Sequence, residues 1–270
     1  MVTPNSQLMT EPATIRTAAR GGSSQADRLK MRFYPEARFG GFTDLDGTML
    51  FHTRVNALVE PEHVVVDVGC GRAEHGEDPV RLRRDLKVLK GKCRRVIGID
   101  LDPNARDNPY LDEFRLIPAD DTAFPVETAA VDVCVGDYVF EHVREPARFL
   151  AECHRILKPG GLLCLRTTNV NSYVGLAATL VPNRLHARVV GWAQRGRQAR
   201  DVFPTQYRAN TPGKLRRALG QAGFDHCVYT HDPEPSYLSR SSVAYYLGVL
   251  HQRFAPAAFG PVMFAFGRKT

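Results

Sequence analysis

The stretch Val64-Val65-Val66-Asp67-Val68-Gly69-Cys70-Gly71 decides the fold class of this chain. Its three consecutive β-branched residues predict a strand that is buried on both faces, as strands of parallel sheets are. The Gly-x-Gly turn that follows lacks Cβ atoms at Gly69 and Gly71, so the backbone can turn sharply and a ligand can approach it closely. A turn of this kind, between a first strand and a first helix, is where doubly wound α/β proteins bind nucleotides.

The residues of this turn favour one kind of nucleotide. A dinucleotide-binding turn needs a third glycine three positions after Gly71, and this chain has Glu74 there. Asp67 places an acid where it would repel a pyrophosphate and attract a cation. We therefore predict that the turn binds a nucleoside that carries positive charge and no phosphates.

The composition is that of a globular chain with a positive net charge. At 270 residues, 43% of them hydrophobic, the chain can form one large α/β domain with additions, or two small domains. The net charge of +7 is mostly arginine, which is consistent with an anionic partner or with compositional bias. The 6 cysteines show no metal-ligand spacing, so we predict free thiols, no metal site and a cytoplasmic location. No signal peptide or membrane-spanning run is recognisable.

Acidic residues follow the predicted strands at the carboxyl edge of the sheet. Asp100 ends the second strand, where its carboxylate can accept hydrogen bonds from both hydroxyls of a ribose. Asp120 and Asp121 follow the third strand, where a carboxylate can accept from an adenine amine, although such a pair is also typical of a turn. The fourth strand, 131–136, leads into the loop Asp137-Tyr138-Val139-Phe140-Glu141-His142.

Residues 55–168 resemble class I S-adenosylmethionine-dependent methyltransferases, in particular the small-molecule type 11 group. One departure is Arg72-Ala73, where the family often has Thr-Gly. The order and spacing of the matching segments matter more than any single one of them. These segments are Val66-Asp67-Val68-Gly69-Cys70-Gly71, Gly98-Ile99-Asp100, the Asp120 turn, Phe140-Glu141-His142-Val143 and Glu152-Cys153-His154-Arg155-Ile156-Leu157-Lys158-Pro159-Gly160-Gly161.

The resemblance implies a doubly wound, Rossmann-like α/β fold. It has a seven-stranded, mostly parallel sheet with the last strand antiparallel and helices on both faces. The resemblance also implies that the glycine turn holds the methionine part of S-adenosylmethionine, Asp100 the ribose and Asp120 the adenine. S-adenosylhomocysteine would be the product. The complete set of predicted cofactor contacts is Asp67, Gly69, Cys70, Gly71, Asp100, Leu101, Asp120, Asp121 and Asp137.

The acceptor side is predicted from polar groups near the ends of the fourth and fifth strands. If the acceptor atom is a hydroxyl oxygen, a base must take its proton. His142 is our candidate because an imidazole titrates near neutral pH, with a packing role as the alternative. Substrate contacts are predicted for Tyr138, Glu141, Asn169 and Tyr173. We expect O-methylation of a small molecule before N-methylation.

The remaining segments are predicted to surround this core. We expect a disordered tail at 1–27, an N-terminal brace at 28–60, a cofactor-binding half at 61–168, a helical insertion or substrate cap at 169–210, and a C-terminal half at 211–270. The basic stretch 184–200 could contact substrate, an anionic surface or solvent. Residues 236–259 are predicted as a packed helix with a loop, with a membrane-surface element as the alternative. The run Asp44-Leu45-Asp46-Gly47-Thr48 resembles the first motif of haloacid-dehalogenase-type phosphatases, but no strand precedes it, so we predict a turn.

Three other functions are weighed against methyl transfer. An NAD-dependent oxidoreductase is disfavoured by Glu74 and by the long spacing from the glycine turn to Asp100. A methyltransferase-like module could bind ligand without turnover. An RNA methyltransferase is disfavoured because no base-reading motif is present, so no nucleic-acid partner is expected. The acceptor and the oligomeric state are left open by the sequence.

Overall fold

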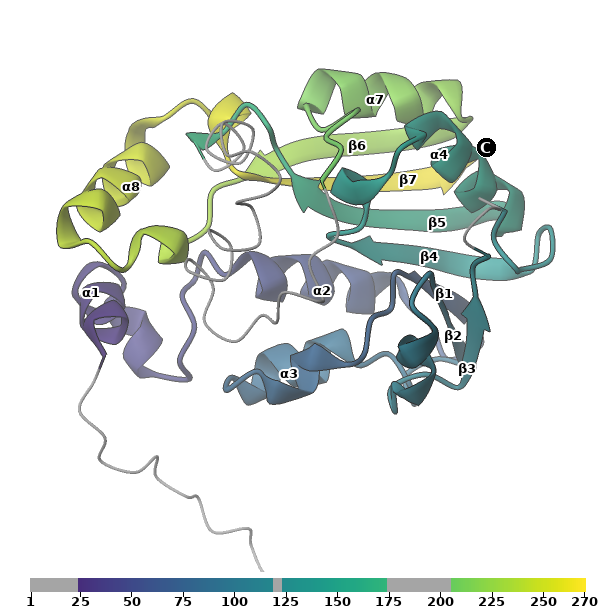
Figure 1. Ribbon diagram of the computed structural model, residues 1–270, viewed down its shortest axis with the longest axis horizontal. Coiled ribbons are helices and arrows are strands. Elements are labelled where there is room, and N and C mark those ends of the chain that lie inside the picture. The colour runs from purple at the N-terminus through teal and green to yellow at the C-terminus, as the bar shows by residue number, and fades with distance from the viewer. Residues whose placement is uncertain (1–23, 119–122, 174–204) are drawn as a thin grey trace, which may run out of the picture.

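The computed structural model describes residues 24–118, 123–173 and 205–270, and its centre is a seven-stranded sheet (Figure 1). The strand order is β3-β2-β1-β4-β5-β7-β6. Strand β7 runs antiparallel to β5 and β6, and the other neighbours are parallel. The strands are β1 (Val64–Val68), β2 (Arg95–Asp100), β3 (Glu113–Leu116), β4 (Val131–Asp137), β5 (Leu157–Thr168), β6 (Phe224–His231) and β7 (Val262–Lys269). The predicted sheet is confirmed, including its antiparallel last strand.

Helices cover both faces of the sheet, as the alternation of buried residues along β1 requires. Val64, Val66 and Val68 pack in one core with α4 (Pro146–Ile156) and α7 (Pro212–Gln221). Val65 packs on the opposite face with Phe51 and Val55 of α2 (Gly47–Leu58), beside which α3 (Arg81–Lys87) lies. The glycine turn therefore leaves the sheet between two covered faces, at the carboxyl edge of the parallel strands.

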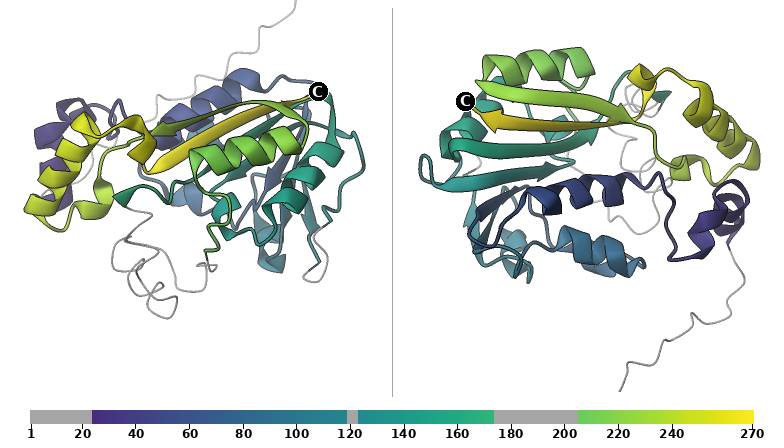
Figure 2. Two further views of the ribbon diagram at one scale, coloured as in Figure 1. Left: turned by 90° about the horizontal axis from the view of Figure 1, so that it is seen from above. Right: turned by 180° about the vertical axis from the view of Figure 1, so that it is seen from behind.

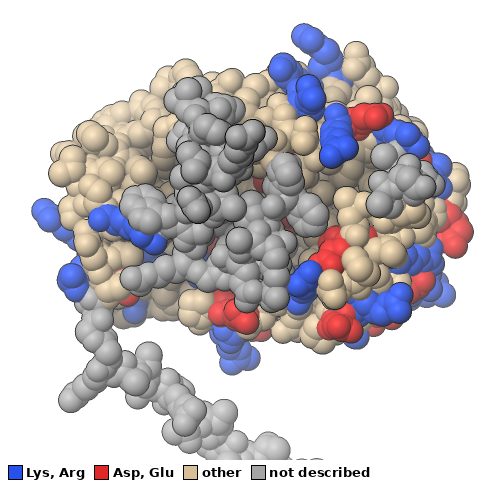
Figure 3. Space-filling view, in the orientation of Figure 1, with Lys and Arg blue, Asp and Glu red and all other residues tan. Residues whose placement is uncertain are grey.

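Two further helices pack together beyond the carboxyl edge of the sheet (Figure 2). They are α1 (Gln25–Phe33) and α8 (Ser242–Phe254), and their contact is a small apolar core that includes Leu29, Tyr245 and Val249. We call this pair of helices the α1–α8 lobe. The surface over α8 is largely uncharged (Figure 3).

Several element boundaries differ from the sequence prediction. Helix α2 begins at Gly47, inside the run predicted as a turn, because Oδ1 of Asp46 accepts the backbone N–H groups of Thr48 and Met49 and so caps the helix. The phosphatase-like run is therefore a turn at Asp44 and Leu45, as predicted, but its last two residues already belong to α2. Helix α1 begins at Gln25, inside the predicted tail.

Some predictions fall on residues outside those described. They are the tail up to residue 23, Asp120 and Asp121, and the basic stretch 184–200. Among the described residues, no helix is both long enough and apolar enough to cross a bilayer.

Candidate cofactor and acceptor site

The glycine turn is fastened to the end of β2. Gly69 and Gly71 have φ angles of 66° and 59°, a left-handed conformation that glycine adopts at little cost. The backbone N–H of Gly71 donates to Oδ2 of Asp100 over 2.9 Å, and that of Asp102 donates to Oδ1 over 2.9 Å. The Asp100 side chain is thereby fixed at the sheet edge. Because a carboxylate oxygen has two lone pairs, each oxygen can still accept a hydrogen bond from a ligand hydroxyl.

Three carboxylates gather around this turn, at the ends of neighbouring strands. Burial raises the pKa of Asp67 to about 7, and the charges of Asp137 and Asp100 act in the same direction, while Lys87 opposes them. The Lys87 ammonium lies 3.9 Å from Oδ2 of Asp137. A phosphate in this crevice would add to the repulsion among the carboxylates, whereas a cation would relieve it. The residues present therefore fit a positively charged nucleoside.

A buried ion pair joins the ends of β4 and β5, next to the glycine turn. Nε and one terminal nitrogen of Arg166 donate to the two oxygens of Asp137 over 2.5 and 2.6 Å, and Arg166 is 3% exposed. His52 on α2 lies 3.1 Å from the same carboxylate. Burial alone would raise the pKa of Asp137, but the Arg166 charge and the His52 hydrogen bond hold it well below its usual range. The third Arg166 nitrogen donates to the hydroxyl of Thr48, which ties α2 to the two strands.

Sequence reasoning assigned no role to His52 or Arg166. One feature of the sequence could have indicated the ion pair: a single arginine ends the otherwise apolar stretch 162–166, and an aspartate ends the strand before it. The register of the sheet pairs Asp137 with Arg166 directly. Without the strand order, the sequence could not show that these two residues are neighbours.

A pocket of about 250 Å³ opens beside Arg166 at this edge of the sheet. Its wall includes Tyr138 and Tyr173, both predicted as substrate contacts, and Tyr237, which was not. Tyr138 has a φ of 58°, and its ring lies 4.6 Å from the Arg166 guanidinium carbon. Burial raises the pKa of Tyr138 and of Tyr173 above the usual range, so both phenols stay protonated at neutral pH. The pocket therefore offers aromatic surface together with hydroxyl groups.

The other predicted substrate residues are engaged in internal hydrogen bonds. Asn169 is fully buried, and its amide donates to the carbonyls of Ala258 and Gly260 over 2.9 Å each. Glu141 is buried as well, and its Oε2 accepts from Thr167 over 2.8 Å. Asn169 thus holds the backbone that precedes β7, and Glu141 is bonded to the end of β5.

Three remaining predicted residues are placed as follows. His142 is partly buried in a 3₁₀ turn, Phe140–His142, and is not among the described residues that line the 250 Å³ pocket. Cys70 is buried beneath the glycine turn, and Leu101 is 54% exposed just beyond Asp100. The structure thus brings Asp67, Asp100 and Asp137 together around the glycine turn. Tyr138 and Tyr173 lie together in the wall of the 250 Å³ pocket.

With this arrangement established, comparison with known proteins identifies the domain. Residues 66–165 match the type 11 family described as a methyltransferase domain. The chain carries a type 11 methyltransferase domain. Its strand order is the one that the sequence resemblance to class I methyltransferases implies.

Relatives of this methyltransferase domain cover only part of the chain. A probable S-adenosylmethionine-dependent methyltransferase of Mycolicibacterium smegmatis is 32% identical over 39% of this chain and 38% of its own length. A ubiquinone biosynthesis O-methyltransferase of Cereibacter sphaeroides is 31% identical over 60% of each chain. The chain thus spans less than two thirds of the length of these curated relatives.

The methyltransferase fold extends over more of the chain than the sequence match does. The crystal structure of a possible histamine N-methyltransferase from Thermotoga maritima has a TM-score of 0.51 and 16% identity. The match covers 90% of this chain and 95% of that one. At this identity the likeness shows the fold.

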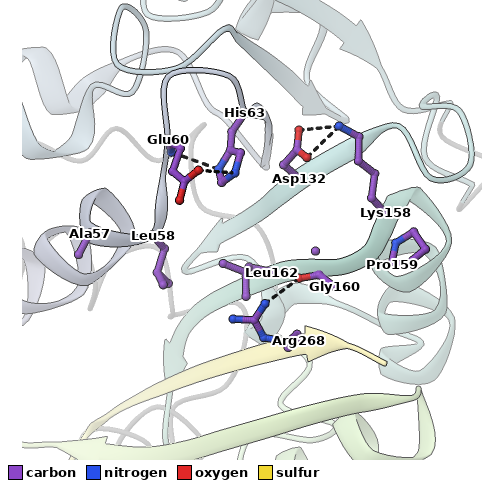
Figure 4. Close-up of a pocket in the computed structure, with 11 residues that line it drawn as sticks. Ala57, Leu58, Glu60, His63, Asp132, Lys158, Pro159, Gly160, Leu162 and Arg268 are labelled. Carbon is purple, nitrogen blue, oxygen red and sulfur yellow. Dashed lines mark hydrogen bonds and ion pairs between the residues drawn. The ribbon is translucent and has the colours of Figure 1, made fainter.

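The methyltransferase domain has a larger pocket at the opposite, amino edge of the sheet, of about 340 Å³ (Figure 4). Its charged groups bond to one another or to backbone. Lys158 donates to Asp132 over 2.8 Å, and Arg268 donates to the carbonyl of Gly160 over 3.2 Å. The glycine turn and Asp100 lie at the other edge of the sheet and do not line this larger pocket.

Proposed function

We propose that this protein transfers a methyl group from S-adenosylmethionine to a small-molecule acceptor, with oxygen favoured over nitrogen as the acceptor atom. The observation that carries the proposal is the set of carboxylates Asp67, Asp100 and Asp137 around a left-handed glycine turn. This set favours a cationic nucleoside over a dinucleotide. The adjoining pocket at the same edge gives an acceptor a place beside it.

The residues of the chain then act mainly by holding the two reactants. Asp100 would accept hydrogen bonds from the ribose, and the turn backbone would bind the methionine part. When bound, S-adenosylmethionine supplies a methyl group already activated by a sulfonium. Tyr138 and Tyr173 would position the acceptor and exclude water. Such positioning lowers the barrier of a two-reactant step by up to about 7–11 kcal/mol.

A hydroxyl acceptor also needs a base, and the structure offers a second candidate beside the predicted His142. Glu234 lines the acceptor pocket, and burial raises the pKa of its carboxyl. A raised pKa makes a carboxylate a better proton acceptor near neutral pH. Oxygen as the acceptor atom is supported by the similarity to the Cereibacter sphaeroides O-methyltransferase.

The experiment has two stages. Calorimetry first measures binding of S-adenosylhomocysteine and of NADH, and tight NADH binding without S-adenosylhomocysteine binding would overturn the proposal. The protein is then incubated with S-adenosylmethionine and a panel of phenols, carboxylic acids, alcohols and amines, and release of S-adenosylhomocysteine is recorded. Binding without release on any acceptor would instead favour a ligand-binding module.

The base is identified by pH profiles once an acceptor is known. The variants His142→Ala and Glu234→Gln are compared with the parent protein. Loss of the acidic limb of the rate profile in one variant, with S-adenosylhomocysteine binding unchanged, assigns the base to that residue. If both variants keep the parent profile, neither residue takes the proton.

A further inference from the structure

Helix α8 is apolar on two sides, but the fold covers only one of them. Its inner side packs in the α1–α8 lobe through Tyr245 and Val249, and Gly248 is buried with them. A helix that is apolar all round is normally covered all round. The outer side instead carries large apolar side chains that are each half-exposed or more: Val243 at 71%, Tyr246 at 50%, Leu247 at 58% and Phe254 at 78%. These four residues are the α8 face.

The exposed charged side chains on α1, on α8 and just before α8 are all arginines, while the acidic Asp27 of α1 is only partly exposed. The sequence contains no aspartate or glutamate from residue 235 to residue 270. Arg240 and Arg253 are exposed near the two ends of α8, and Arg28 and Arg32 are exposed on α1, which packs against it. Figure 3 shows the corresponding surface as largely uncharged, with blue side chains along its left border.

We propose that the α8 face docks the protein on an anionic lipid bilayer, with α8 lying in the plane of the interface. An apolar helix face edged by arginine is the combination that binds such interfaces, since the side chains enter the acyl boundary while the cations stay at the headgroups. At 13 residues α8 is too short to span a bilayer. A second copy of this chain fits less well, because a two-fold contact would bring the same arginines together. Nucleic acid would leave the apolar side chains without a partner.

The bilayer interaction is tested without any cofactor, so its outcome is independent of the methyl-transfer proposal. The protein is sedimented with phosphatidylcholine vesicles and with vesicles that also contain phosphatidylglycerol. We expect binding to the anionic vesicles that salt weakens. Leu247→Glu should reduce it about tenfold or more, because a leucine that no longer enters the apolar layer loses its transfer free energy. Leu82→Glu on α3, where Leu82 is 46% exposed, is the matched control and should bind as the parent does.

Each other outcome overturns the proposal. Thermal unfolding of Leu247→Glu and of the parent protein is measured in parallel, so that loss of vesicle binding is not confused with loss of fold. Equal binding to neutral and anionic vesicles would show that the arginines do not contribute to binding. No vesicle binding by the parent protein, or undiminished binding by Leu247→Glu, would reject a bilayer contact. Concentration-dependent dimers that Leu247→Glu abolishes would assign the α8 face to a second copy.

Discussion

The backbone N–H of Gly71 and the side chain of Asp100 are joined by a hydrogen bond of 2.9 Å, so the glycine turn and the end of β2 form one unit. A second backbone hydrogen bond, from Asp102, holds the other oxygen of the same carboxylate. The group that we assign to the ribose is therefore oriented before any ligand binds. A ligand hydroxyl would therefore bind to a carboxylate whose orientation is already fixed, so binding would not have to order that side chain.

Removal of this carboxylate should weaken cofactor binding strongly. We expect Asp100→Ala to weaken S-adenosylhomocysteine binding by about 1.5–3 kcal/mol, or roughly 10–150-fold, the size of a lost charge-assisted hydrogen bond. Calorimetry gives the dissociation constant, and thermal unfolding shows whether the fold persists. Asp107→Ala, which removes an exposed acid from the turn after β2, is the control and should leave affinity unchanged. An unchanged constant for Asp100→Ala would refute the ribose assignment.

Cofactor affinity should depend on pH through Asp67. Its folded-state pKa of about 7 is above its ordinary value of 3.8, so folding takes up a proton between these values and this carboxyl makes the protein less stable as pH rises through them. A cationic ligand favours the ionised carboxylate. Affinity for S-adenosylmethionine should therefore increase as pH rises toward about 7 and level off at higher pH.

The variant Asp67→Asn supplies the comparison. It should show a flatter affinity profile and weaker S-adenosylmethionine binding at high pH, together with a higher unfolding temperature there, because one buried charge is gone. S-adenosylhomocysteine, which lacks the sulfonium charge, should show a smaller pH dependence in the parent protein. Identical profiles for the parent and the variant would show that another group titrates.

The sequence was sufficient for the sheet and for the edge at which Asp67 and Asp100 lie, for a physical reason. Runs of β-branched residues predict buried strands whatever surrounds them, and the acid at the end of such a strand must lie at the sheet edge. Asp67 and Asp100 could thus be placed from local pattern alone. Their pKa behaviour could not, because it depends on which other charges approach.

The pocket beside Arg166 was less predictable because its residues come from distant segments. Tyr237 and Glu234 precede α8, Lys30 lies on α1, and all three line the pocket beside Arg166. No local pattern connects them, since their neighbourhood arises from the packing of the α1–α8 lobe against the sheet. Asn169 was predicted to face substrate from its position after β5, but buried amides often serve backbone carbonyls, and here this one does.

The buried ion pair should be important for stability. Arg166→Met leaves the carboxylate of Asp137 buried beside only His52 and Lys87, and we expect a loss of about 3–5 kcal/mol in the free energy of unfolding. The double variant Asp137→Leu/Arg166→Met removes both charges and should recover much of that loss. Chemical denaturation of Arg166→Met, Asp137→Leu and the double variant measures the interaction free energy between the two side chains. Additive losses would show that the two side chains act separately.

The same pair predicts the acid limit of stability. The folded-state pKa of Asp137 is held below its ordinary value of 3.8, so its contribution is complete above that pH and disappears as pH falls through the lower folded value. The parent protein should therefore lose more stability below about pH 4 than Asp137→Leu/Arg166→Met does. Parallel denaturation curves at acidic pH test this, and equal slopes would place the acid sensitivity elsewhere.

Ala73 gives a prediction that separates strain from function. It has a φ of 71°, a left-handed conformation that costs a residue with a Cβ about 1–2 kcal/mol, while glycine adds about 0.4–1 kcal/mol of unfolded-state entropy. Ala73→Gly should therefore stabilise the protein by about 0.5–1 kcal/mol. Because the Cβ next to the cofactor edge is removed, S-adenosylhomocysteine affinity should also increase. Ala129, with a φ of 52° next to the amino end of β4, provides the control. Ala129→Gly should raise the unfolding temperature similarly but leave affinity unchanged, and a destabilised Ala73→Gly would show that this turn does not store strain.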